Sequence, residues 1–141
     1  MHIRAATNQD CDIVHAFMCE LEEDVMDINS FRQHYQQSLQ NDNHYYWVAE
    51  TSRQIIGFIS LHTQLLLHHN GWTGEVQELY VHKEFRKQGI GHLLLEKVEQ
   101  QAQALSLKEL EVSANVKRLH THRFYQRYGF VSTHIKFTKN L

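Results

Sequence analysis

The chain has 141 residues, 42% of them hydrophobic and 11% aromatic, with a formal charge of −2 at pH 7. This size fits one globular domain, residues 1–141, whose core needs neither a disulfide nor a structural metal. No apolar run approaches the ~20 residues of a membrane span, and acidic and basic residues are interleaved, so we expect neither a membrane protein nor a nucleic-acid binder. The first residues show no secretory leader pattern, which predicts a cytoplasmic protein.

The first half of the chain alternates short helical and extended patterns. Ile13, Phe17 and Leu21 recur at helical spacing after Asp10, which could cap that helix. The polar residues 51–54 separate two stretches rich in aromatic and β-branched residues, which predicts a hairpin. The elements expected here are a strand over 2–6, the helix after Asp10, a helix over 30–39, and strands over 45–50, 55–66 and 75–82.

The second half predicts a helix packed on a sheet, then further alternation. The helix carries an apolar stripe at 3.6-residue spacing, formed by Ile90, Leu94, Val98, Ala102 and Leu105. A strand over 109–113, a helix over 119–128 ended by Gly129, and a last strand over 131–138 complete the pattern. The order favours a mixed α/β (α+β) sheet covered by helices on both faces. Cys11 and Cys19, ~12 Å apart along the first helix, should remain unbridged.

Residues 75–91 carry the densest chemical signal. A predicted strand runs into a loop that opens a helix at Gly89-Ile90-Gly91, where free backbone N–H groups and the helix dipole favour a phosphate. Arg86 and Lys87 add positive charge. A P-loop would need Gly-Lys-Ser/Thr at this point and a Rossmann loop a third glycine, and neither pattern is present.

The motif Arg-x-x-Gly-x-Gly after a strand resembles motif A of the GNAT superfamily, whose loop grips the pyrophosphate of CoA. Residues 122–130 contain Phe-Tyr-x-x-x-Gly-Phe, which is similar to the C-terminal motif of the same superfamily. The resemblance implies a central, mostly antiparallel sheet of six to seven strands with about four helices. It also implies acetyl-CoA as cosubstrate, held by Leu79, Tyr80, Val81, Arg86, Lys87, Gln88, Gly89, Ile90, Gly91, His92 and Asn115.

Further short matches resemble the aminoalkylphosphonate N-acetyltransferases and run from the first helix to the C-terminus. They include Cys19-Glu20-Leu21, His68-His69, Trp72-x-Gly74-Glu75-x-Gln77-Glu78-Leu79, Asn115-Val116-Lys117-Arg118 and Phe137-Thr138-Lys139. This resemblance implies a small primary amine as acceptor, with an aminoalkylphosphonate favoured. A polyamine, an aminoglycoside or a protein N-terminus stay open as acceptors, and so does a non-catalytic acyl-CoA-binding module. A homodimer is the default assembly.

An alkylamine with a pKa near 10 is about one part in a thousand neutral at pH 7, so an acetyltransferase of this kind needs a base. Glu78 is the favoured candidate and Glu75 its rival; strand alternation predicts that the two point to opposite faces. A backbone N–H at Leu79 or Val81 would stabilise the developing oxyanion. The family motif implies Tyr125 as the acid for the departing thiolate, with Tyr128 as competitor.

The histidines show no tight metal motif, although the chain has twelve of them. The resemblance to the phosphonate enzymes implies that a divalent metal could be held loosely by His68, His69 or Glu78. The same two histidines and Arg118 are candidate contacts for the acceptor.

Overall fold

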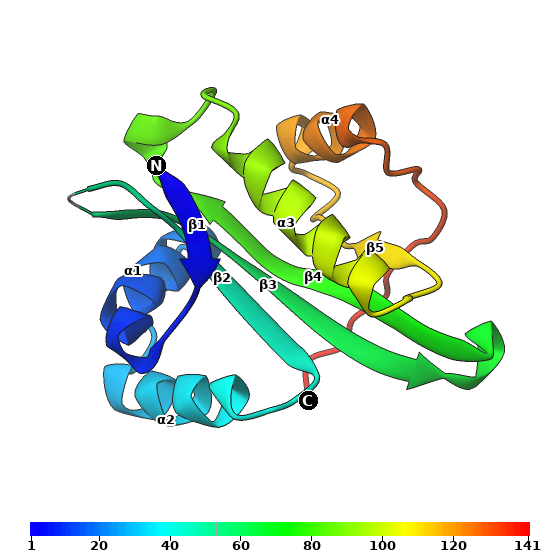
Figure 1. The fold of residues 1–141 in the computed structure, drawn as a ribbon, viewed down its shortest axis with the longest axis horizontal. Helices are drawn as coiled ribbons and strands as arrows, with labels where there is room; N and C mark the ends of the chain where they lie inside the picture. Colours follow the sequence, from blue (N-terminus) through cyan, green and yellow to red (C-terminus); the bar gives the residue numbers. More distant parts are fainter. Residues whose placement is uncertain (53) are drawn as a thin grey trace.

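The computed structural model describes residues 1–52 and 54–141 and has an α+β architecture around one mixed sheet (Figure 1). The sheet order follows the chain, β1-β2-β3-β4-β5, with antiparallel pairs up to β4 and a parallel β4–β5 pair. The strands are β1 (His2–Ala5), β2 (His44–Glu50), β3 (Ile55–Leu66), β4 (Gly71–Val81) and β5 (Leu110–Val112).

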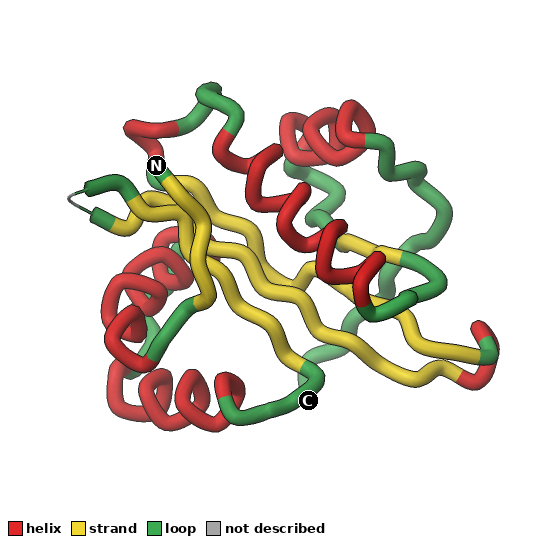
Figure 2. Tube along the Cα trace, viewed as in Figure 1, coloured by secondary structure: helices red, strands yellow, loops and turns green. Residues whose placement is uncertain are grey.

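Four α-helices cover the sheet, two on each face (Figures 1 and 2). They are α1 (Cys11–Glu22), α2 (Ile28–Leu39), α3 (Ile90–Ala104) and α4 (Leu119–Tyr128). The apolar stripe of α3 packs on one face of β2, β3 and β4, and α4 adds Tyr125 to that core. Residues of α1 and α2 form a second core against Val48, Phe58 and Tyr80 on the opposite face. Both predicted layers are therefore present.

The start of α1 differs from the simple cap that the sequence suggested. Asp10 does precede the helix, but its side chain makes no capping bond to it. The buried carboxylate instead accepts hydrogen bonds from the Arg4 guanidinium at 2.8 and 2.9 Å and from the Thr7 backbone N–H at 2.8 Å. Arg4 holds the pKa of Asp10 below its usual value. The carboxylate therefore ties β1 to the segment that enters α1.

The predicted strand over 131–138 does not form, so the described sheet has five strands rather than six to seven. Figure 2 shows the chain after α4 as a loop. Its alternating apolar side chains Val131, Ile135 and Phe137 stay 78%, 78% and 89% exposed. Alternation is a local pattern, whereas a strand also needs a partner edge, and β5 is only three residues long.

The remaining predicted elements are confirmed within about four residues of their expected ends, and β3 and α4 match in full. The predicted hairpin joins β2 to β3, with the Thr51 N–H donating to the Gln54 carbonyl at 2.8 Å; Arg53 lies outside the described residues. Both cysteines are free thiols, as expected. Across residues 1–52 and 54–141, no helix has the length and apolar character that a membrane crossing requires.

Candidate active site

The centre of β4 carries a bulge at the point where β5 leaves it. β5 pairs with β4 only over Gly74–Val76. Immediately afterwards, Ser60 of β3 stands opposite both Gln77 and Glu78, so one residue of β3 faces two of β4. A bulge bends its strand and increases the local twist. Within the described chain, residues 77–81 therefore have no strand partner on the β5 side, and their backbone groups there are open to a ligand.

The bulge overturns the prediction that Glu75 and Glu78 point to opposite faces. Val76 and Leu79 are three residues apart, yet both pack against the core beneath α3. The extra residue resets the alternation between them. Glu75 and Glu78, which directly precede these two residues, both lie on the opposite face. Both candidate bases can therefore line one site.

Glu78 is held in a buried, hydrogen-bonded position. The fully buried Ser60 hydroxyl donates to Oε1 of Glu78 at 2.5 Å and accepts from the Glu78 backbone N–H at 2.9 Å. Burial raises the pKa of Glu78, the Ser60 hydrogen bond opposes that rise, and the negative charge of Glu22 adds to it. A carboxylate with a raised pKa is a stronger base than a solvated one. No sequence motif marks Ser60, because its role depends on the bulge.

Glu75 lies farther along the same face, in a more polar setting. Its Oε1 accepts a hydrogen bond from Nε2 of Gln77 at 3.1 Å. In the sheet it stands between His62 of β3 and Glu111 of β5. Burial and the neighbouring His44 lower the pKa of His62 to about 4, so this imidazole is neutral at pH 7. Around Glu75, the face therefore consists of neutral and acidic groups.

The glycine loop before α3 has the expected geometry at Gly89 and a second role at Gly91. Gly89 is the N-cap residue with φ +82°, and a Cβ there would meet nothing within 4 Å. Gly91 is different, because its Cβ would lie 3.0 Å from Cζ of Phe124 in α4. Gly89 therefore keeps the loop open toward solvent, whereas Gly91 allows α3 and α4 to pack closely.

The other residues expected around the cosubstrate divide into exposed and internally bonded groups. Lys87 and Gln88 are exposed, while Nε of Arg86 donates to the Val81 carbonyl at 2.8 Å. His92 contacts Glu96 at 3.0 Å. Three further residues are packed into the cores on either face: Leu79, Tyr80 and Ile90. Tyr80 also donates from its hydroxyl to Glu20, so its side chain is structural and only its backbone is open to a ligand.

The two candidate tyrosines are in different states. The ring of Tyr125 is buried between Phe124 and Phe130, and its hydroxyl has no hydrogen-bond partner among the described residues. Burial raises the pKa of Tyr125 to about 12, against the lowering effect of Arg118. The Tyr128 hydroxyl instead donates to Glu99 at 2.7 Å. Of the two, only Tyr125 has a hydroxyl available to a bound molecule.

Tyr125 and Glu78 lie on opposite sides of β4. Tyr125 belongs to the core beneath α3, whereas Glu78 shares the other face with Tyr80. No hydrogen bond joins their side chains in the described chain. The unpartnered stretch 77–81 separates them, so an acid and a base could reach a group bound along this stretch from its two sides.

Asn115 and Arg118 shape the entry to α4. The Asn115 side chain accepts from the Lys117 N–H at 2.9 Å, and its carbonyl accepts from His122 at 2.7 Å. Nη2 of Arg118 donates to the Leu21 carbonyl at 2.8 Å, which links α4 to the end of α1. As placed, Arg118 is a structural tie as well as a source of positive charge.

The histidine pair does not form the metal group that the sequence suggested. His68 is exposed, while His69 turns toward Glu109 and Glu111 of the β5 region rather than toward Glu78. Sequence reasoning missed both of these carboxylates. The spacing Glu-x-Glu in a short strand could have indicated that they share a face.

Comparison with known proteins agrees with this geometry. Residues 11–130 match the model of the acetyltransferase (GNAT) family. The chain is 41% identical over 139 residues to an aminoalkylphosphonate N-acetyltransferase of Salmonella typhimurium, covering 99% of this chain and 90% of that protein.

Solved structures show the same fold at low identity. A transcriptional regulator from Bacillus halodurans C-125 superposes with a TM-score of 0.92 at 20% identity, covering 99% of both chains. An aminoglycoside 6'-N-acetyltransferase from Acinetobacter baumannii gives 0.84 at 20% identity, over 99% of this chain and 98% of that one. Together, the family match and the full-length relative establish that the chain belongs to the GNAT family of acetyltransferases.

Proposed function

We propose that this N-acetyltransferase moves the acetyl group of acetyl-CoA onto the primary amine of an aminoalkylphosphonate. The observation that carries the acceptor is the 41% identity, over 99% of the chain, to a protein described as an aminoalkylphosphonate N-acetyltransferase. The fold neighbours do not bear on the acceptor, because GNAT pockets vary where the catalytic frame does not.

The donor site is the unpartnered stretch of β4 together with the loop before α3. Acetyl-CoA supplies an activated thioester. Residues 77–81 offer backbone groups for its pantetheine arm, and the loop ending at Gly89 offers N–H groups at a helix N-terminus for its pyrophosphate. Exposed Lys87 adds charge at the same place.

Glu78 is the proposed base. Its burial raises its pKa, so the carboxylate can accept a proton from the ammonium form of the acceptor. Ser60 fixes the position of this carboxylate through two hydrogen bonds. Glu75 is the alternative, since it lies on the same face and its carboxylate is partly exposed.

The remaining steps fall to β4 and α4. As the amine nitrogen bonds to the thioester carbon, a backbone N–H at Leu79 or Val81 stabilises the negative charge that develops on oxygen. The carbon–sulfur bond then breaks, and the Tyr125 hydroxyl gives its proton to the departing thiolate. An unpartnered hydroxyl with a pKa of about 12 remains protonated at neutral pH and can act as this acid.

The test is thiol release from acetyl-CoA over a panel of amines, compared by kcat/KM. The panel contains aminomethylphosphonate, 2-aminoethylphosphonate, spermidine, kanamycin and a peptide with a free N-terminus. We expect one of the phosphonates to exceed the other amines by at least tenfold. A faster reaction with spermidine, kanamycin or the peptide would replace the acceptor, and release with none of them would favour a binding module.

A further inference from the structure

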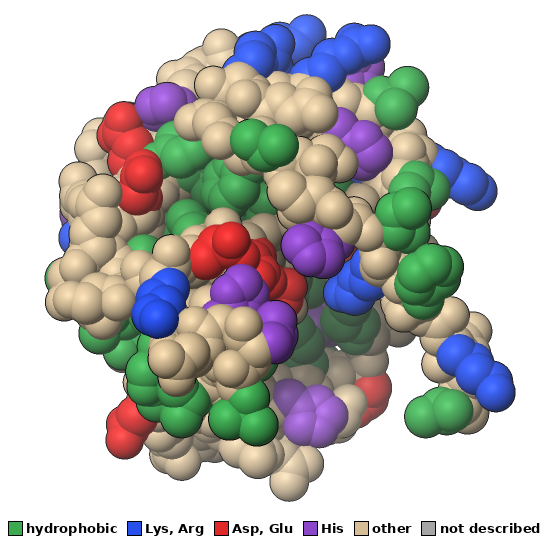
Figure 3. Space-filling model, turned by 90° about the vertical axis from the view of Figure 1, so that its right-hand side faces the viewer, with side chains coloured by type: hydrophobic (Ala, Val, Ile, Leu, Met, Phe, Trp, Pro, Cys, Tyr) green, Lys and Arg blue, Asp and Glu red, His purple; other side chains and the backbone are tan. Residues whose placement is uncertain are grey.

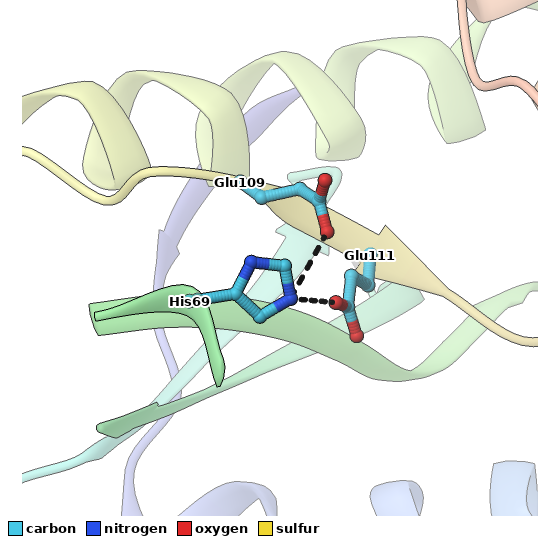
Figure 4. A group of neighbouring side chains, drawn as sticks. All are labelled: His69, Glu109 and Glu111. Atoms are coloured by element: carbon cyan, nitrogen blue, oxygen red, sulfur yellow. Dashed lines mark ion pairs between the residues drawn. The ribbon is translucent and has the colours of Figure 1, made fainter. Parts of the chain in front are cut away.

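Three side chains from two segments converge at the edge of the sheet. Figure 4 shows His69, from the turn between β3 and β4, pointing toward Glu109 and Glu111 of the β5 region. Nε2 of His69 lies 3.8 Å from Oε1 of Glu109 and 3.7 Å from Oε1 of Glu111. One ligand atom from each residue falls within a common 4.8 Å.

These distances are too long for hydrogen bonds, which join nitrogen and oxygen at about 2.7–3.2 Å. The three atoms therefore surround a shared space instead of bonding to one another. An imidazole with two carboxylates is a mixed donor set that suits Mn²⁺, Zn²⁺ and similar divalent cations. Three protein ligands also leave coordination positions for another molecule.

The cluster lacks a compensating positive charge beside its carboxylates. Burial raises the pKa of Glu111, and the neighbouring carboxylates of Glu109 and Glu75 raise it further. Lys108 is nearby, but its Nζ donates to the backbone carbonyl of His69 at 3.3 Å. A bound cation would relieve the repulsion among the carboxylates.

A second observation points to the same place. Oγ1 of Thr73 is the only fully buried side-chain polar atom without a partner among the described residues, and Thr73 itself is 0% exposed. Gly74, the next residue, pairs with Leu110, so Thr73 stands next to Glu109 in the parallel register. Thr73 lies on the face of β4 that also carries Glu75. Buried hydroxyls normally have partners, so this one indicates a missing ligand or its water.

The cluster shares a face with both candidate bases. Leu110 and Val112 pack toward α3, so the alternate residues Glu109 and Glu111 lie on the opposite face, and Glu111 is paired with Glu75. Figure 3, viewed from the side of the β3–β4 hairpin, shows carboxylates gathered beside histidines near the centre of this surface. An anionic acceptor approaching Glu75 and Glu78 here would be repelled unless a cation intervened.

We propose that His69, Glu109 and Glu111 form a divalent-cation site whose open coordination positions take the phosphonate group of the acceptor. The cation site stands on the geometry of the three side chains, and its contact with a phosphonate rests on the function proposed above. Binding there would place the anionic end of the acceptor beside β5 and leave its amine free to reach Glu75 and Glu78 on β4.

The first experiment measures Mn²⁺ binding to metal-free protein by calorimetry and by electron paramagnetic resonance, without acetyl-CoA or amine. We expect about one ion per chain. His69→Gln, Glu109→Gln and Glu111→Gln should each weaken binding at least tenfold, about 1.4 kcal/mol. His34→Gln, an exposed histidine on α2, is the matched control and should bind Mn²⁺ as wild type does. Unchanged melting temperatures would show that the variants fold.

Two results would overturn the site. One is equal Mn²⁺ affinity in wild type and all three variants, and the other is no binding at millimolar Mn²⁺, which would leave an ordinary ion pair between His69 and the carboxylates. Loss of binding in His68→Gln but not in His69→Gln would move the site to the other histidine.

The second experiment titrates 2-aminoethylphosphonate into Mn²⁺-loaded and chelator-treated protein, with propylamine as the ligand without an anionic group. We expect at least tenfold tighter binding of the phosphonate to the loaded protein and no metal effect on propylamine. Mn²⁺ binding without this preference would remove the phosphonate contact and keep the cation site. Rapid phosphonate acetylation by a protein that binds no metal would remove the site and keep the proposed function.

Discussion

Ser60 and Glu78 are joined by two hydrogen bonds, from the serine hydroxyl to the carboxyl at 2.5 Å and from the Glu78 backbone N–H to the hydroxyl at 2.9 Å. The pair sits at the bulge of β4, where one residue of β3 faces two of β4. Ser60 therefore fixes both the backbone and the carboxyl of the proposed base.

Ser60→Ala should shift the pH profile of the enzyme. The hydroxyl lowers the pKa of Glu78 against the raising effect of burial, so its loss should raise that pKa further. The acidic limb of kcat/KM should then move to higher pH, with about a tenfold loss on that limb and recovery toward wild type at alkaline pH.

Thr63→Val is the matched control, because it removes another buried β3 hydroxyl, which donates to the Asn43 carbonyl at 3.2 Å. We expect it to lower the melting temperature without moving the pH profile. An unshifted limb in Ser60→Ala would mean that Glu78 does not set the pH dependence.

Glu78→Gln and Glu75→Gln should separate the two candidate bases. Loss of the base should lower kcat/KM by roughly 10²–10⁴ at neutral pH, and activity should recover as rising pH deprotonates the free amine. We expect this pattern for Glu78→Gln and a smaller, pH-independent loss for Glu75→Gln. The opposite assignment of the two patterns would make Glu75 the base.

Tyr125→Phe should affect the chemical step alone. Because the Tyr125 hydroxyl has no partner within the described chain, its removal should leave the melting temperature and acetyl-CoA affinity nearly unchanged while kcat falls roughly 10²–10⁴-fold. Tyr128→Phe should give the reverse, since its hydroxyl donates to Glu99. That variant should lose about 1 kcal/mol of stability and keep its kcat. If Tyr125→Phe retains more than about half of wild-type kcat, the proton comes from another donor.

The two glycines of the loop before α3 should respond differently to substitution. Gly89→Leu forces a side chain into φ +82° at the proposed pyrophosphate site and should weaken acetyl-CoA binding at least tenfold by calorimetry. Gly91→Ala should mainly lower the melting temperature, because its Cβ would press on the Phe124 ring at 3.0 Å.

The double variant Gly91→Ala/Phe124→Leu tests the second half of this expectation. A smaller side chain at 124 should recover part of the melting temperature lost in Gly91→Ala. Equal losses of acetyl-CoA affinity in Gly89→Leu and Gly91→Ala, with no change in melting temperature, would instead place both glycines at the ligand.

The sequence alone was sufficient for the order of the elements and for the family. The stripe from Ile90 to Ala102 and the alternation in β3 are local periodicities, and they identify helix and strand without knowledge of what packs against them. The glycine loop and the motif around Tyr125 are likewise contiguous in the chain. The residues that they mark could be named before any contact was known.

The tertiary structure alone decided which of those residues meet. The bulge opposite Ser60 reversed the expected orientation of Glu75 relative to Glu78, because one inserted residue resets the faces of a strand. His69 joined Glu109 and Glu111, forty residues away, through the parallel pairing of β5 with β4. Residues 131–138 stayed outside the sheet although their pattern alternates, since pairing depends on an edge that the segment itself does not contain.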